Sequence, residues 1–172
     1  NQRVYSKTLS GITYYVWEDS DGTSHYFYHD STAAVYKDED GLMLELTVKS
    51  SGSPRYIIKD KSGNTSNFDS NGRLISLANN QETQSSISIT YTTSTGWIIS
   101  TITDGVGRKY SFTYTNGLLS RISYKGTGST EISYVSFGYN NSNLTSITDK
   151  DGGTVAYTYG ANHLLTSATD VD

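Results

Sequence analysis

Apolar and polar residues alternate along much of the chain with a period of two. In "KYSFTY" (109–114) and "TVAYTY" (154–159), every second residue is aromatic or aliphatic. Such alternation is typical of a β-strand that buries one face and turns the other toward solvent. Short segments of Gly, Asn, Asp and Ser, which favour turns, separate these runs. The pattern therefore predicts an all-β chain built from antiparallel hairpins.

One hairpin pattern recurs along the chain. Each copy has an aromatic residue, a short turn, an aliphatic residue and a second aliphatic residue three positions later. The copies are "FDSNGRLISLAN" (68–79), "TGWIISTITD" (95–104), "YTNGLLSRIS" (114–123), "YNNSNLTSITD" (139–149) and "YGANHLLTSATD" (159–170). The last aliphatic position falls at residues 77, 102, 122, 147 and 168, so alternate copies recur about every 45 residues. Such a period indicates units that bury their apolar faces against their neighbours.

A second motif, Asp-x-x-Gly followed by alternating apolar residues, precedes several strands. It occurs with Asp104 and Gly107, and again with Asp149 and Gly152. Related segments lie at 19–27, 38–46 and 60–68. The motif predicts a turn in which the Asp side chain bonds the backbone and the Gly adopts positive φ.

Two Asn-Gly pairs, Asn71-Gly72 and Asn116-Gly117, carry the signature of a type I′ hairpin turn. One spacing conflicts with a regular strand. Leu119 and Ile122 are three residues apart, which would place them on opposite faces of the sheet. Either a β-bulge intervenes, or the first aliphatic residue caps the turn.

Composition narrows the class of protein. The 172 residues include 15 tyrosines and no cysteine, which excludes a disulfide scaffold and a Cys-ligated zinc site. The net charge is −4 and the 13 Lys and Arg are spread along the chain, so we expect no nucleic-acid partner. Neither a signal peptide nor a membrane span is recognisable, and we expect the chain to be a segment of a longer polypeptide.

The repeats resemble the YD-repeat, or Rhs-repeat, family. The family motif runs roughly Gly, several residues, Tyr-x-Tyr-Asp, two residues, Gly-Arg-Leu. Residues 60–172 carry the resemblance, and residues 1–59 are similar to the strand-rich region that precedes the repeats in wall-associated proteins of Gram-positive bacteria. The copy closest to the motif supplies Phe68, Asp69, Gly72, Arg73 and Leu74.

The later copies are degenerate. Phe112/Tyr114 and Tyr157/Tyr159 match Tyr-x-Tyr, while Thr115 and Gly160 stand where the motif Asp is expected. In this comparison only Arg73 matches the motif Arg.

The resemblance implies an extended, curved sheet that forms part of a β-shell. In polymorphic toxins and teneurins, such a shell encloses another part of the chain. We therefore expect a non-catalytic structural segment of a secreted or cell-surface bacterial protein, with neighbouring repeats of the same polypeptide as its partners. The alternative is a carbohydrate-binding or adhesive module that contacts cell-wall or host glycans.

The candidate chemistry is sparse. We find no nucleophile elbow, P-loop or carboxylate pair typical of a glycosidase, and we expect no enzymatic activity and no cofactor. His25 and His29 would lie about 13 Å apart on a strand, too far to share one zinc ion. "DSDG" (19–22), "DEDG" (38–41) and "DKDG" (149–152) resemble calcium loops but lack the remaining EF-hand ligands, which favours ordinary turns.

The aromatic residues admit two interpretations. Alternating Tyr and Phe side chains most often pack against neighbouring hairpins, whereas aromatics exposed on a sheet can stack on sugar rings. The residues that decide between these interpretations are Tyr110, Phe112, Tyr114, Tyr157 and Tyr159.

Overall fold

The computed structural model describes residues 2–32, 35–80, 86–93 and 96–171. The chain divides into two compact units, Asn1–Ile98 and Ile99–Asp172. The strands of the first unit are β1 (Arg3–Leu9), β2 (Ile12–Glu18), β3 (Ser24–Asp30), β4 (Val35–Asp38), β5 (Glu45–Val48), β6 (Tyr56–Lys59), β7 (Thr65–Phe68), β8 (Leu74–Ala78) and β9 (Ile87–Tyr91). Residue 60, where the sequence predicts the repeats to begin, lies in the turn between β6 and β7 of this unit.

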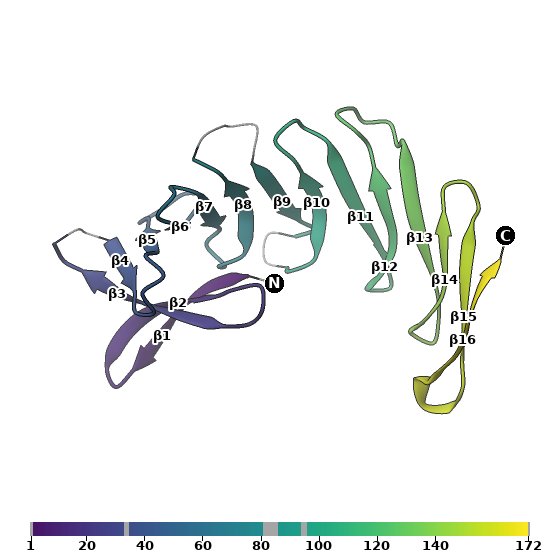
Figure 1. The fold of residues 1–172 in the computed structure, drawn as a ribbon, viewed down its shortest axis with the longest axis horizontal. Coiled ribbons are helices and arrows are strands. Elements are labelled where there is room, and N and C mark those ends of the chain that lie inside the picture. Colours follow the sequence, from purple (N-terminus) through teal and green to yellow (C-terminus); the bar gives the residue numbers. More distant parts are fainter. Residues whose placement is uncertain (1, 33–34, 81–85, 94–95, 172) are drawn as a thin grey trace. The chain divides into compact units, whose positions relative to one another are not determined.

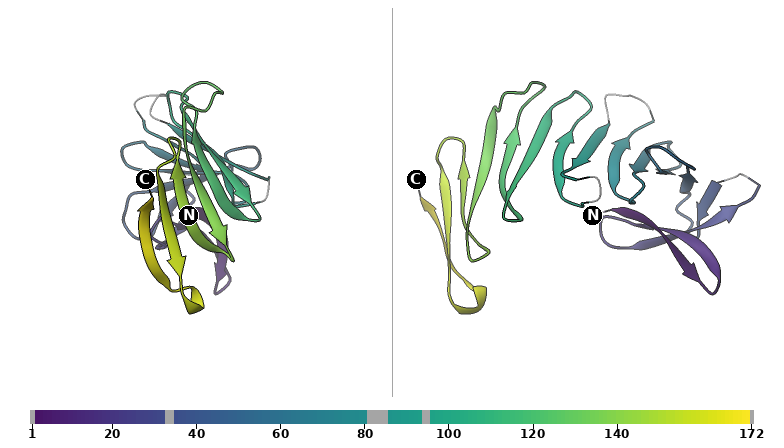
Figure 2. Two further views of the ribbon diagram at one scale, coloured as in Figure 1. Left: turned by 90° about the vertical axis from the view of Figure 1, so that its right-hand side faces the viewer. Right: turned by 180° about the vertical axis from the view of Figure 1, so that it is seen from behind.

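The second unit follows in the colours from green to yellow (Figures 1 and 2). Its strands are β10 (Ile99–Thr103), β11 (Lys109–Thr115), β12 (Leu118–Tyr124), β13 (Ser133–Asn140), β14 (Asn143–Asp149), β15 (Thr154–Tyr159) and β16 (Leu165–Val171). A single turn of 3-10 helix, Ala161–His163, lies between β15 and β16. Among the described residues, no helix is long and apolar enough to cross a membrane.

Hydrogen bonding follows chain order within each unit, so each strand pairs antiparallel with the strands before and after it. This meander of hairpins confirms the all-β fold class predicted from the alternating pattern. The physical reason is that strands joined by only two to eight residues meet before any other partner is within reach.

A β-bulge explains the three-residue spacing of the aliphatic positions. In the β11–β12 hairpin, Phe112 pairs with Ile122 and Tyr114 pairs with Leu119, which leaves Ser120 as the extra residue. The same register shift occurs in the β7–β8, β13–β14 and β15–β16 hairpins. Because the bulge absorbs one residue, both aliphatic side chains of each copy lie on the same face.

The two Asn-Gly pairs form different turns. Asn116 and Gly117 both adopt positive φ, 51° and 79°, as a type I′ turn requires. At the other pair only Gly72 has positive φ, 77°, and its N–H donates to the Asp69 carbonyl at 3.0 Å. The prediction of a type I′ turn at Asn71-Gly72 was therefore wrong. The Asp69 side chain bonds the backbone of this turn and selects a three-residue loop that ends in a left-handed glycine.

The first unit has a hydrophobic core. Val4, Phe27, Leu46, Ile58 and Phe68 come from five different strands and are at most 3% exposed. Its sheet curls until β1 meets the β7–β8 turn, where the Val4 N–H donates to the Gly72 carbonyl at 2.9 Å. At this meeting point Arg3 and Arg73 form an isolated β-bridge and not a continuous ladder of paired residues. The described strands therefore do not close into a barrel.

The second unit is organised differently. None of its described apolar side chains is fully buried, although many are half-buried. Its apolar residues pair across strands on one face, as with Phe137 and Ile147. The other face carries Ser and Thr residues together with Arg121 and Tyr134. This unit is a single layer of sheet in which cross-strand neighbours supply the packing.

Candidate functional site

Five turns of the Asp-x-x-Gly type share one hydrogen-bond geometry. In each, one carboxylate oxygen of the Asp accepts the backbone N–H groups two and four residues later, at 2.8–3.1 Å. The Gly has φ between 77° and 98° and donates its N–H to the Asp carbonyl. The Asp residues of these turns are Asp19, Asp60, Asp69, Asp104 and Asp149. The motif is thus a structural turn whose carboxylate replaces missing backbone partners.

This geometry bears on the calcium hypothesis. Asp19 and Asp149 each use one carboxylate oxygen for two backbone N–H groups. Asp38 uses both of its oxygens, for Leu42 N and Leu44 N. In the part of the chain that the structure describes, no group of three His, Cys, Asp or Glu side chains is arranged to hold a metal ion. The contacts favour turns over ion sites.

Arg73 lies at the centre of the most buried of these turns. Its side chain is 7% exposed, and its Nε donates to Asp69 Oδ2 at 2.7 Å. Its Nη1 donates to the carbonyls of Thr93 and Gly96, and the guanidinium lies 4.4 Å from the centre of the Tyr91 ring. Arg73 therefore links its own turn to the segment after β9.

Arg108 stands at the equivalent position of a second turn, which the comparison of copies missed. It pairs with Asp104 Oδ2 through Nε at 2.6 Å, as Arg73 does with Asp69, but its side chain is 55% exposed. The signal was present in the sequence, since "DSNGR" (69–73) and "DGVGR" (104–108) have identical spacing. Burial raises the pKa of Asp104, but the side-chain and backbone hydrogen bonds from Arg108, together with its charge and the Val106 N–H, outweigh burial and lower this pKa.

The candidate aromatic residues share one face of the second unit. Strand alternation puts Tyr110, Phe112 and Tyr114 on one side of β11, and Tyr157 and Tyr159 on one side of β15. Tyr110 is 47% exposed, and the other four are half-buried.

Cross-strand partners cover these rings in part. Ile122 lies opposite Phe112, and the Tyr110 and Tyr124 rings are 5.2 Å apart. The face thus combines packing between neighbouring strands with accessible aromatic surface, so both interpretations of these residues remain predictions.

His25 forms a cluster that the sequence did not predict. Its side chain is 11% exposed, and its ring packs 5.1 Å from the Trp17 ring. Its Nδ1 lies 2.8 Å from Asp40 Oδ2, and its Nε2 lies 3.2 Å from Asp19 Oδ2. His29 packs instead against Tyr36, with ring centres 5.0 Å apart. The two histidines therefore have different surroundings, consistent with their expected separation along a strand.

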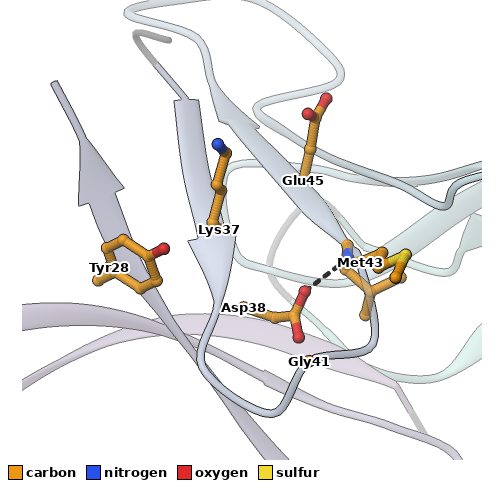
Figure 3. Close-up of a pocket in the computed structure, with 7 residues that line it drawn as sticks. Tyr28, Lys37, Asp38, Gly41, Met43 and Glu45 are labelled. Carbon is orange, nitrogen blue, oxygen red and sulfur yellow. Dashed lines mark hydrogen bonds between the residues drawn. The ribbon is translucent and has the colours of Figure 1, made fainter. Parts of the chain in front are cut away.

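Pockets occur on the first unit among the residues that the structure describes. One, of about 320 Å³, lies beside the loop after β4, and Tyr28, Lys37, Asp38 and Met43 are among its lining residues (Figure 3). Lys37 pairs with Asp30 at 2.7 Å. Another pocket, of about 410 Å³, is lined by aliphatic residues, Trp17 and polar residues of the Asp60 turn.

Comparison with known protein families gives a match for the C-terminal part of the chain. Residues 135–172 match the family model described as RHS Repeat. This part of the chain is similar to an RHS repeat. The match spans β13–β16, including the Asp149 turn and the Tyr157/Tyr159 pair. No curated protein matches the chain.

The RHS match confirms the resemblance over residues 135–172. The hairpins β7–β8 and β11–β12, outside the matched residues, have the same bulge after the first aliphatic residue. A tyrosine further along the chain donates its hydroxyl to the carbonyl of that residue in both: Tyr91 to Leu74 at 2.7 Å, and Tyr139 to Leu119 at 2.9 Å. The recurring bulge and tyrosine show that the hairpin architecture extends beyond the RHS match. RHS repeats are in general structural rather than catalytic.

Proposed function

We propose that this chain is a non-catalytic structural segment of a secreted or cell-surface bacterial protein. In this proposal it forms part of an RHS-type β-shell that encloses or presents another part of a longer polypeptide. The family match supports the repeat character, and the wall-associated location rests on the sequence resemblance.

The observation that supports this proposal is that the sheet of the second unit has one apolar face and one polar face. One face presents Phe112, Ile122, Phe137 and Ile147, and the other presents mainly Ser and Thr side chains, with Tyr134 among them. A single layer of sheet leaves such an apolar face partly in contact with water, which costs about 25 cal/mol per Å² of apolar surface. Folding an array of these hairpins around an interior removes that surface from water.

Hydroxyl-radical footprinting tests the shell. The segment alone is compared with the longer polypeptide that contains it. We expect Tyr110 and Tyr157 to be oxidised several-fold more slowly in the longer polypeptide, because their face lines the interior. Tyr134, which the strand register places on the opposite face, is the control and should keep its rate. Equal oxidation of Tyr110 and Tyr157 in both samples would rule out an enclosed aromatic face.

A carbohydrate-binding or adhesive role is the second candidate. The observation that favours it is the exposure of Tyr110, 47%, on the same face as Tyr157 and Tyr159. A ring that is accessible to water is also accessible to a sugar. On a glycan array, we expect any binding through this face to be lost in Tyr110→Ala and kept in Tyr134→Ala. If no glycan on the array binds, the carbohydrate-binding role is refuted and only the structural role remains.

A further inference from the structure

His25 sits between two carboxylates that belong to different turns. Asp19 begins the turn between β2 and β3, and Asp40 lies in the loop that follows β4. Both ring nitrogens of His25 lie within hydrogen-bond distance of a carboxylate oxygen, at 2.8 and 3.2 Å. The ring itself is covered by Trp17.

This geometry determines the charge of the imidazole. A carboxylate only accepts hydrogen bonds, so each of the two contacts needs an N–H on the ring. A neutral imidazole has one N–H, and its other nitrogen would point a lone pair at a carboxylate. Both contacts form together only when His25 is the doubly protonated imidazolium.

We propose that His25 is a pH-sensitive latch that ties the Asp19 turn to the loop at residues 39–44, and that its deprotonation releases this loop. The Asp40 contact is the one that opens. The Asp40 side chain is 47% exposed, whereas Asp19 is 21% exposed and is held by two backbone N–H groups. The part of the loop that moves holds Gly41 and Met43, which line the pocket of Figure 3, while the Leu42 and Leu44 N–H groups stay hydrogen-bonded to Asp38.

The titratable groups around His25 set the direction of the pH dependence. Among the described residues, Asp19 and Asp40 contact the ring, and Asp21 lies beside Asp19 in the same turn. Burial lowers the pKa of His25, but the hydrogen bonds to Asp40 and Asp19 outweigh it and raise the pKa above its ordinary value. Side-chain hydrogen bonding with Asp21, and then with His25, lowers the pKa of Asp19 to about 2.

The latch is therefore closed over a defined pH range. A raised histidine pKa contributes stability that is present below about pH 6.5 and is lost as the pH rises through the folded-state pKa. A depressed carboxylate pKa contributes stability that is present above about pH 3.9 and is lost as the pH falls toward 2. The closed state is favoured most between these two ordinary values.

Nuclear magnetic resonance of the folded chain tests the latch directly. At pH 6, we expect both nitrogens of His25 to carry protons and its titration midpoint to lie above about 6.5. Met43 is the single methionine, so its methyl group gives one signal from the loop. That signal should titrate with the same midpoint as His25. A single neutral tautomer of His25 at pH 6, or a Met43 signal that does not follow His25, would overturn the proposal.

Two variants separate the latch from general effects of charge. Asp40→Asn should lower the His25 midpoint by about one pH unit and abolish the titration of the Met43 methyl signal. Asp151→Asn, at a side chain that is 85% exposed in the second unit, should change neither signal. An unchanged His25 midpoint in Asp40→Asn would refute the Asp40 contact. The titration of the unmodified chain decides the matter even if a variant folds poorly.

Discussion

Replacing Arg73 by Ala tests whether a buried ion pair supports the first unit. The substitution removes the partner of Asp69, whose side chain is only 14% exposed, and the donor to the carbonyls of Thr93 and Gly96. It also removes the cation that packs on the Tyr91 ring. The remaining acceptors stay in a partly buried site without their donor.

The expected loss is large relative to the stability of a small unit. Removing one partner of a buried ion pair costs about 3–5 kcal/mol, because the other charge stays behind. Since Asp69 keeps its backbone hydrogen bonds in the turn, we expect the lower end, about 3 kcal/mol. A typical domain has about 5–15 kcal/mol of folding free energy in total, so this is a substantial fraction.

Urea unfolding followed by tryptophan fluorescence measures the effect. Both tryptophans, Trp17 and Trp97, lie in the first unit, so their emission reports its unfolding. A loss of about 3 kcal/mol lowers the unfolding midpoint by about 1–3 M urea. Arg73→Lys, which keeps the charge but loses the planar fork of donors, should give an intermediate midpoint.

Arg108 supplies a matched control for the ion pair itself. It makes the same contact with its Asp in the same type of turn, but its side chain is 55% exposed. An exposed pair contributes little, so the turn should tolerate Arg108→Ala without a measurable change in the hydrogen-exchange protection of the β11 and β12 amides in the second unit. The reasoning fails if Arg73→Ala leaves the urea midpoint of the first unit unchanged.

Three further predictions concern the turns and the aromatic face. Gly72→Ala should destabilise the first unit more than Gly22→Ala. Both glycines have positive φ, but only a Cβ at Gly72 would lie 1.8 Å from the Val4 carbonyl oxygen. Equal urea midpoints of the two variants would refute this close approach. Phe112→Ala should lower the melting temperature of the second unit by several degrees, since a half-buried ring contributes about 1 kcal/mol. The β11 and β12 amide signals in nuclear magnetic resonance follow this melting, and an unchanged value would mean that the face is free. Calcium titration by calorimetry should give no stoichiometric heat, because the Asp turns use their carboxylates for backbone N–H groups; a heat with defined stoichiometry would contradict the turn assignment.

Local patterns were enough to predict the fold class and the position of most hairpins. Alternation placed Tyr110, Phe112 and Tyr114 on one face, and the structure keeps them there. The Asp-x-x-Gly motif identified turns because its hydrogen bonds close within five residues. The bulge was one of two alternatives, and only strand pairing could choose between them.

The turn at Asn71-Gly72 shows where a short motif misleads. The pair alone predicts a type I′ turn, but Asp69, two residues earlier, offers its carboxylate to the backbone and selects a different loop. The error came from considering two residues where the turn depends on five.

The sequence by itself determined the strands, the turns and the division into an apolar and a polar face, because each depends on residues within a few positions of one another. Tertiary structure alone decided that Arg73 is buried while Arg108, in the same motif, is exposed. It also decided that Asp40 reaches His25, fifteen residues away. Burial and charge pairing depend on which strands the curling sheet brings together. A pattern of residues close in sequence does not contain that information.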